Sequence, residues 1–535
     1  AFGTVDFLMN TTDVRGGEQS MFRAIEPEAT IVLNGTEYQV GGLRSTDTFR
    51  AYCNRSKLKR SLIAAPQQSD KTTFRYVSHT VGTPVAPFPW TPGNRHGIKS
   101  DWPPKGVTLS VVFETKADVP LRVIMHYECY DGIPVLSKWM DITSTNAGPE
   151  VDTIISSVTV EQFAAMPRFG SYIPEGSRAP NADDEGASHA GTTAPVPLLH
   201  VKSDQAHGVL CEWVNDYLSS NDSHVSPLTP HDQGAAESKL NCSYTIGPGA
   251  HVNKQESFVS FRVLMLATDT TEETRQMLMR QRMMQVLAPH TTENPIFFHA
   301  TSVDEVGFRN AIDQMAEVGF EMLIFSFGTD FHLETANTTY LQTIKRQVDY
   351  ANSKGIEVGG YDLICLDRGH GGYGGNVGDQ WVTVDATTGA LKANACFASG
   401  WYDKLKGLVA NFLRVTGLSM LETDGPYGGD DCASHNHSHH HGEEDSVYRQ
   451  TQLQNQFYHD MRQLGVYVNQ PDNYFLQGGS RSGMGYDENQ YSLPRWEDIS
   501  ISRMGMYDDL YSFLPTQGWM FVPLVEYHGG GAAAS

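Results

Sequence analysis

The hydrophobic pattern of the chain changes near residue 294, and this change limits the folds that it can adopt. Before residue 294, short β-branched runs such as 106–113 are punctuated by Gly, Pro, Asn and Asp, as is typical of antiparallel sandwiches. After it, apolar runs alternate with stretches of helical periodicity, as is typical of parallel sheets whose strands are joined by helices. We expect a β domain over residues 1–270, a helical linker over 271–293 and a strand–helix domain over 294–535.

The strand–helix domain offers six strand candidates and four helices. The expected strands are 295–298, 320–327, 356–364, 418–421, 466–469 and 520–526. The expected helices are 302–318, 340–354, 400–416 and 445–464, the first opened by a capping-box pattern at Ser302–Glu305. Because a closed (β/α)8 barrel has eight strands, a barrel here would be incomplete at the C-terminus or would hide strands in its loops.

The β domain is expected to be built from short strands with one long insertion. The clearest strand candidates are 30–33, 106–113, 121–127, 157–160 and 258–265. The segment 167–195 is rich in Gly, Ala, Ser and Asp and reads as an exposed loop. Residues 272–288 are rich in Met, Arg and Gln and are expected to form the connecting helix.

The composition argues against several classes of partner. The 535 residues carry a net charge of −23, which argues against nucleic acid, whose phosphates require Lys and Arg, and against anionic membrane surfaces. No run approaches the roughly 18 apolar residues of a membrane span. The hydrophobic content of 40% and charged content of 19% are those of an ordinary globular protein. The oligomeric state is left open.

Cysteine and asparagine usage favours export. The seven cysteines include no Cys-X-X-Cys pair, which argues against a zinc ribbon or redox motif and leaves at least one thiol unpaired. The Asn-X-Ser/Thr sequons begin at Asn10, Asn34, Asn54, Asn221, Asn241, Asn337 and Asn436, more than composition predicts. The chain starts at Ala1 without Met, as expected of a mature or trimmed chain. We expect a secreted or extracellular glycoprotein, or a periplasmic protein if the source is bacterial.

The segment Gly417–Gly429 carries the strongest catalytic signal. Its apolar run leads directly into Glu422 and Asp424 and then breaks at a Gly-Pro turn. Parallel α/β folds present catalytic carboxylates in this way, at the C-terminal ends of strands. Alternation along a strand would point both acids to the same side. The alternative is that Asp424 only caps the following loop.

Three further segments carry polar or aromatic side chains in unusual density. Residues 466–495 combine aromatic, amide and acidic side chains that suit a sugar site, with an Ω-loop as the alternative. The Gly-rich segment 367–375 reads as a flexible active-site loop rather than a phosphate cradle. The tract His435–His441 reads as a solvated or adventitious metal-binding loop, with a metal-dependent hydrolase as a further alternative. No functional metal or cofactor is expected, and neither Cys365 nor Cys396 is expected to be a nucleophile.

The motifs of the chain resemble, in order, those of glycoside hydrolase family 36, the α-galactosidase and raffinose-synthase group. The matching segments are 126–139, 293–298, 418–424, 477–481, 485–489 and a helix at 493–506. The resemblance implies an antiparallel β-supersandwich followed by a TIM-type (β/α)8 barrel. It further implies a retaining, α-galactosidase-like hydrolase with a carbohydrate substrate and with Asp424 as the nucleophile.

The resemblance leaves two matters open. The acid/base is either Asp487 or Glu488, and Glu488 is favoured because its side chain is one methylene longer. The family's nucleophile strand usually reads Lys-Trp-Asp where this chain has Glu422-Thr423-Asp424, which leaves the substrate open. Candidate substrate contacts are Glu422, Asp472, Tyr474, Arg481, Trp381, Tyr427, Asp330 and Asp367, of which the last two could equally cap loops. The alternative function is a non-catalytic carbohydrate-binding or structural glycoprotein with a glycosidase fold.

Overall fold

A computed structural model of the chain describes most of its first 469 residues. The described residues are 2, 8–11, 17–20, 27–41, 71–91, 95, 97–115, 119–145, 151–164, 171–175, 198–202, 208–214, 239–244, 247–268, 272–293, 295–300, 304–326, 329–369, 375–424 and 430–469. They form two compact units. The first lies within Ala1–Val85, Pro104–Ala179 and Gly191–Met283, and the second contains Ala86–Pro103 and the described residues from Met284 onward. The expected strand at 520–526 lies outside the described residues.

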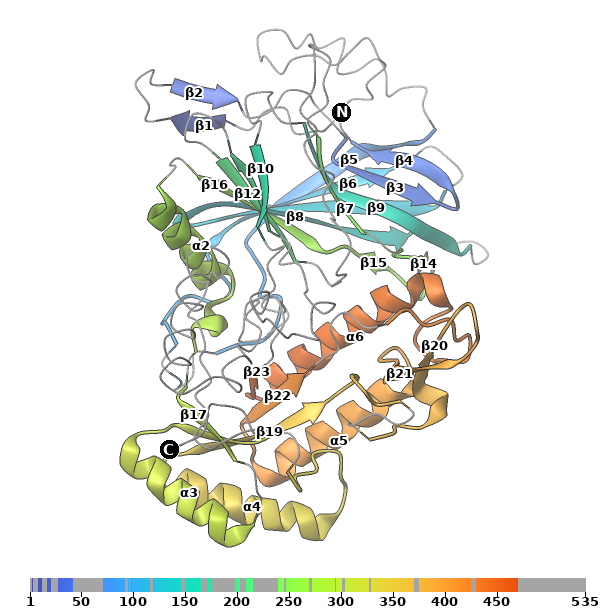
Figure 1. Cartoon of the computed structure of the whole chain (residues 1–535). Helices are drawn as coiled ribbons and strands as arrows, with labels where there is room; N and C mark the ends of the chain where they lie inside the picture. The colour runs from blue at the N-terminus through green and yellow to red at the C-terminus, as the bar shows by residue number, and fades with distance from the viewer. Residues whose placement is uncertain are drawn as a thin grey trace. The chain divides into compact units, whose positions relative to one another are not determined.

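The described residues of the first unit before α2 form mainly antiparallel strands (Figure 1). The strands are β1 (Leu8–Thr11), β2 (Gly17–Ser20), β3 (Ala29–Leu33), β4 (Thr36–Val40), β5 (Thr73–Gly82), β6 (Gly106–Glu114), β7 (Leu121–Tyr130), β8 (Ile133–Ser144), β9 (Thr153–Ala164), β10 (Ser171–Glu175), β11 (Leu198–Lys202), β12 (Gly208–Val214), β13 (Lys239–Ser243), β14 (Ala250–Val252), β15 (Phe258–Val259) and β16 (Arg262–Thr268). The main sheet runs in the order β10-β11-β12-β16-β8-β7-β6-β5-β4-β3-β9-β13, with β14 on β9 and β15 on β8. Only the short β4–β5 pair within it is parallel.

Side-chain alternation explains these strands. Along β7, Leu121, Val123 and Met125 are buried while Arg122 is exposed, so one face packs into a core and the other meets water. The turn between β3 and β4 consists of Asn34 and Gly35, with φ of 47° and 77°. Positive φ at both central residues defines the type I′ turn that favours tight hairpins.

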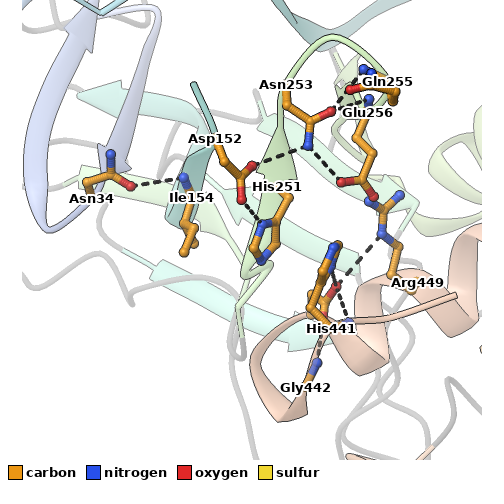
Figure 2. A network of polar contacts seen from close by, with 11 residues as sticks. Asn34, Asp152, Ile154, His251, Asn253, Gln255, Glu256, His441, Gly442 and Arg449 are labelled. Carbon is orange, nitrogen blue, oxygen red and sulfur yellow. Dashed lines mark hydrogen bonds and ion pairs between the residues drawn. The ribbon is translucent and has the colours of Figure 1, made fainter. Parts of the chain in front are cut away.

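Polar side chains secure one edge of this unit, as Figure 2 shows. The Asn34 Oδ1 accepts a hydrogen bond from the backbone N–H of Ile154 at 3.0 Å. The Asp152 carboxylate lies 2.5 Å from His251 Nδ1 and accepts from Asn253 Nδ2 at 3.3 Å. These contacts join the β3–β4 turn and the end of β14 to the start of β9.

Two expectations for the β domain need correction. The expected loop 167–195 contains strand β10, which pairs with β11. The expected strand 258–265 is divided into β15 and β16 at Ser260 and Phe261. There the Ser260 hydroxyl accepts from the Met140 N–H at 2.9 Å, and the Phe261 N–H donates to the Tyr244 hydroxyl at 3.0 Å. The Ser260 N–H still donates to the Met140 carbonyl at 2.9 Å, so one ladder bond is kept while side chains accept from the Met140 and Phe261 N–H groups.

The second unit contains a five-stranded parallel sheet in chain order, β17-β18-β19-β22-β23. The strands are β17 (Phe297–Ala300), β18 (Met322–Phe325), β19 (Glu357–Leu363), β22 (Met420–Asp424) and β23 (Tyr467–Asn469). The helices α3 (Glu305–Val318), α4 (Thr338–Ser353), α5 (Gly400–Thr416) and α6 (Glu443–Gln463) join successive strands. The connection from β19 to α5 also carries the hairpin β20 (Val382–Val384) and β21 (Leu391–Ala395), with the short 3₁₀ helix η2 (Asp379–Trp381) before it. The sheet thus repeats the βα unit expected from the sequence.

Before this sheet, α2 (Glu273–Leu287) occupies the position of the expected connecting helix and is followed by the 3₁₀ helix η1 (Pro289–Thr292).

Local capping chemistry sets the ends of the helices. The α3 helix is capped by Asp304, which accepts from the Gly307 N–H, rather than by the expected Ser302. The α6 helix begins at Glu443, two residues early, because the Asp445 carboxylate accepts from the N–H groups of His441 and Gly442. Among the described residues, no helix is both long and apolar enough to cross a membrane.

Arg95, which is distant in sequence from the parallel sheet, contacts the N-terminal ends of three of its strands. The Arg95 guanidinium pairs with Glu357, the first residue of β19, at 2.8 and 2.9 Å. It also donates to the Ser419 carbonyl, just before β22, at 3.3 Å and lies 5.6 Å from the ring centre of Tyr467 at the start of β23. Three strands of the sheet are therefore tied together by one side chain at the end opposite to the candidate active site.

Two adjacent glycines allow the middle of the sheet to pack. A Cβ on Gly359 would lie 2.6 Å from the Met420 Cβ, and one on Gly360 would lie 2.1 Å from the Phe331 ring. Both distances are far below van der Waals contact. The two faces of β19 are therefore occupied by neighbouring side chains that an added methyl group would displace.

We predict that Gly359→Ala destabilises the second unit by about 1–3 kcal/mol, the usual cost of overpacking. The matched control is Gly407→Ala in α5, where an added Cβ meets nothing within 4 Å. That control should gain about 0.5–1 kcal/mol from its higher helix propensity. Urea unfolding followed by circular dichroism measures the free energy of unfolding of both variants. An equal change in the two variants would contradict the packing argument.

Candidate active site

A buried carboxylate lies on the inner face of the parallel sheet. Glu422 on β22 is 1% exposed. Its Oε1 accepts from the Asn469 Nδ2 at 2.8 Å, and its Oε2 lies 3.4 Å from the His299 Nε2. Asn469 ends β23, and His299 lies on β17. Polar side chains from three strands therefore converge on one point inside the sheet.

The contact between His299 and Glu422 shows how strongly the sheet is curved. In the sheet order, β18 and β19 separate β17 from β22. Strands three positions apart in a flat sheet would lie about 14 Å apart, with side chains standing perpendicular to it. An approach of 3.4 Å between the two side chains requires the sheet to curl around them, as barrel sheets do.

The structure extends the strand that carries the predicted nucleophile. β22 ends at Asp424, three residues beyond the expected end at Leu421. Its last residues pair with β19 in register, with Glu422 opposite Tyr361 and Asp424 opposite Leu363. Glu422, Thr423 and Asp424 are polar and follow the apolar run, so the sequence places them after the strand. They belong to the strand because they pair with β19.

The other predicted site residues lie in different surroundings, and some lie outside the described residues. Trp381 ends η2, with its ring centre 6.0 Å from that of Trp401 and the Lys404 ammonium 5.0 Å away. Asp330 is exposed, and its carbonyl accepts from the Tyr340 hydroxyl at 3.3 Å. Asp367 has a φ of 56°, and its N–H donates to the Asn394 Oδ1 at 2.8 Å. The predicted residues Asp472, Tyr474, Arg481, Tyr427, Asp487 and Glu488 lie outside the described residues.

Sequence reasoning missed a buried ionic network beside the end of β19. The Arg368 guanidinium donates to both carboxylate oxygens of Glu334, at 2.6 and 2.8 Å. It also donates to the Leu363 carbonyl at 2.5 Å and lies 3.8 Å from the Asp362 carboxylate. Burial raises the pKa of Asp362 well above its usual value, and the nearby Glu334 raises it further, against the opposing effect of Arg368.

This arrangement predicts a stability that depends on pH. Because the folded pKa of Asp362 is raised above the unfolded value of about 3.9, the folded state binds more protons than the unfolded state. The free energy of unfolding should therefore fall as pH rises from about 4 through the raised pKa. Asp362→Asn cannot ionise, so its stability relative to wild type should improve across that window. The free energies of unfolding of both proteins are measured from pH 4 to 8. If they change with pH by the same amount, the raised pKa of Asp362 is contradicted.

A second cluster lies in the connections that follow β19 and β22. Among the described residues, Cys396, Cys432, His437 and His440 are the group able to hold a metal ion, with ligand atoms all within 4.8 Å of one another. The expectation of a solvated histidine tract therefore needs correction at two of its positions. His437 and His440 are buried. The His435 ring contacts the His441 carbonyl, and the His439 and His441 rings contact the Asp403 and Asp445 carboxylates.

Comparison with known proteins adds a fold relationship. No protein-family model and no curated protein matches the chain. A GH36 α-galactosidase variant, AgaA from Geobacillus stearothermophilus in complex with stachyose, matches with a TM-score of 0.59 at 12% identity, covering 99% of this chain and 80% of that one. The α-galactosidase of Lactobacillus brevis matches with a TM-score of 0.58 at 12% identity, covering 86% of this chain and 65% of that one. AgaB of Geobacillus stearothermophilus gives 0.56 at 11% identity, covering 95% and 78%.

These matches define the class of fold. The chain has a mostly β part and a curled parallel sheet with helices, as in the multidomain GH36 α-galactosidases. The resemblance inferred from the sequence is confirmed at the level of the fold, and the relationship is distant. The chain spans 65% of the length of the Lactobacillus brevis enzyme.

Proposed function

We propose that the chain is a retaining glycoside hydrolase acting on α-linked galactosides or related glycans. The observation that carries the proposal is the position of Asp424. It is the last residue of the fourth parallel strand in a fold shared with GH36 α-galactosidases. The C-terminal ends of barrel strands are where such folds carry their catalytic groups. The complete fold proposed is a β-supersandwich followed by a (β/α)8 barrel.

The surroundings of Glu422 favour Asp424 as the nucleophile. Glu422 is buried and already engaged by Asn469 and His299, so it is poorly placed to attack a substrate. Its role in the proposal is to hold the strand ends together beneath the site. Strand alternation would direct Asp424 to the same face, two residues nearer the C-terminal end.

The proposed mechanism uses two carboxyl groups. The Asp424 carboxylate attacks the anomeric carbon and forms a covalent glycosyl ester, while Glu488, or Asp487 in its place, protonates the departing oxygen. The same acid/base then takes a proton from water, which releases the sugar with its configuration retained. This mechanism requires the two carboxyl groups to lie about 5–5.5 Å apart.

Substrate contacts are proposed from both described and undescribed residues. Trp381 offers an aromatic face, and Asp330 and Asp367 lie in the connections that follow β18 and β19. The remaining candidates are Asp472, Tyr474, Arg481 and Tyr427. The matched AgaA structures were obtained with stachyose and raffinose, so these two α-galactosides are the first substrates to test.

We predict that Asp424→Asn lowers kcat on an aryl α-galactoside or on raffinose by at least about 10⁴-fold, the order of loss that follows removal of a nucleophile. Its melting temperature should stay close to that of the wild type. Asp349→Asn, which changes an exposed α4 carboxylate, is the matched control and should keep full activity. Normal turnover by Asp424→Asn would refute the proposed role.

A second pair of variants identifies the acid/base. Glu488→Gln should lose about 10²–10⁴-fold on raffinose and much less on a substrate with an activated aryl leaving group, which needs no proton. Added azide should restore its turnover and produce an α-glycosyl azide. If Asp487→Asn shows this behaviour and Glu488→Gln does not, the two roles are exchanged. If each variant loses as much activity on the activated aryl substrate as on raffinose, neither Glu488 nor Asp487 is the acid/base.

One observation favours a second candidate function, carbohydrate binding without turnover. In the family that the chain resembles, a lysine that helps bind the substrate usually occupies the position of Glu422, whereas Glu422 is buried and engaged within the sheet. A glycan array separates the two functions. Saturable binding of a glycan that the protein never hydrolyses would favour the non-catalytic alternative.

A further inference from the structure

Four metal-binding side chains meet in the connections that follow β19 and β22. Cys396 follows the β20–β21 hairpin, whereas Cys432, His437 and His440 lie between β22 and α6. All four are buried, with exposures of 0%, 0%, 9% and 5% in that order. The two imidazoles lose hydration on burial and need compensating partners, and each side chain of the cluster carries an atom that can bind a metal ion.

The separations between their ligand atoms fit a tetrahedral metal site. With zinc–sulfur and zinc–nitrogen bonds of about 2.3 and 2.05 Å, the edges of such a tetrahedron run from about 3.3 Å between nitrogens to about 3.8 Å between sulfurs. The Cys432 Sγ lies 3.5 Å from the His437 Nδ1, which lies 3.0 Å from the His440 Nε2. All four atoms fall within 4.8 Å of one another.

The surrounding contacts orient the ligands as metal sites do. The His440 Nδ1 lies 2.9 Å from the Gly442 carbonyl, so it carries the proton and leaves Nε2 free to ligate. The Cys432 sulfur accepts from the Val384 N–H at 3.4 Å. Cys396, Ala398 and Cys432 form an apolar cluster with Val384 and Leu453 packed against it. This packing leaves both cysteine side chains fully buried.

We propose that Cys396, Cys432, His437 and His440 bind one structural zinc ion. Two thiolates and two neutral imidazoles are a preferred zinc ligand set, and the two thiolate charges balance the charge of the ion, which suits a buried site. Four protein ligands leave no position open for water, so the ion would not take part in hydrolysis.

The ion would join two connections at the C-terminal side of the parallel sheet. One connection leads from β19 to α5, and the other leads from β22, which ends at Asp424, to α6. Hydrogen bonds already run between them, from Asn394 to the Asp430 carboxylate at 3.0 Å and from the Ala433 N–H to the Val384 carbonyl at 2.9 Å. Zinc would add a cross-link between residues 36 positions apart in the sequence.

The test uses the 535-residue chain without a polyhistidine tag, produced with zinc in the medium and then desalted. Elemental analysis by mass spectrometry should find about one zinc per chain. Replacement by cobalt should give a thiolate-to-cobalt charge-transfer band and the intense visible bands of a tetrahedral site. Removal of zinc with a chelator should lower the melting temperature by at least about 2–4 °C, which corresponds to about 1 kcal/mol in a domain of this size.

Matched variants separate this site from the rest of the histidine tract. Cys432→Ser and His437→Gln should reduce the zinc content to below about 0.2 per chain. His439→Gln, whose ring contacts Asp403, and Cys365→Ser, outside the cluster, should keep about one. Equal zinc contents in the two cluster variants and the two control variants would overturn the assignment.

If the cluster variants fail to fold, the wild type still decides the question. Absence of the thiolate-to-cobalt band, or a Cys396–Cys432 disulfide in a peptide map of the freshly purified protein, would refute the site. The metal and spectral readouts do not depend on hydrolysis, so the outcome is independent of the proposed function.

Discussion

The parallel pairing of β19 with β22 is the constraint on which the candidate active site depends. It requires Gly359, because a side chain there would collide with Met420, its register partner on β22. Gly360 in turn leaves room for the Phe331 ring, which follows β18. With that approach allowed, the register places Glu422 opposite Tyr361 and Asp424 opposite Leu363. The ends of β19 and β22 are then brought to one level of the sheet. The catalytic proposal rests on this alignment.

Polar contacts lie toward both ends of the parallel strands. At the N-terminal ends, Arg95 ties Glu357 to the starts of β22 and β23, which is a structural task. Toward the C-terminal ends, Glu422, His299 and Asn469 form a buried polar group inside the curled sheet. Both groups join strands of the sheet, and under the proposal the catalytic carboxylate lies beyond the second group, at the strand ends where barrel folds carry their chemistry.

Local signals predicted the regular elements well where the chain supplies its own caps. The helix Gly400–Thr416 agrees with expectation at both ends, because Ser399 caps its start and Gly417 adopts φ 80° at its end. The end of β22 was predicted three residues too early because its pairing comes from β19. Contacts distant in sequence could not be predicted, such as Arg95 with Glu357 or Cys396 with Cys432. The latter cluster has no fixed spacing motif, and the sequence therefore suggested a solvated tract.

The central claim is that Asp424 is the nucleophile of a retaining α-glycosidase, and covalent labelling tests it most directly. An α-galactose-configured epoxide analogue forms a stable ester with the nucleophile of such enzymes, and peptide mass spectrometry locates the labelled residue. The account predicts one label per chain, on Asp424, with loss of hydrolysis in proportion to labelling. A label on another acid, or full labelling that leaves hydrolysis unchanged, would contradict it.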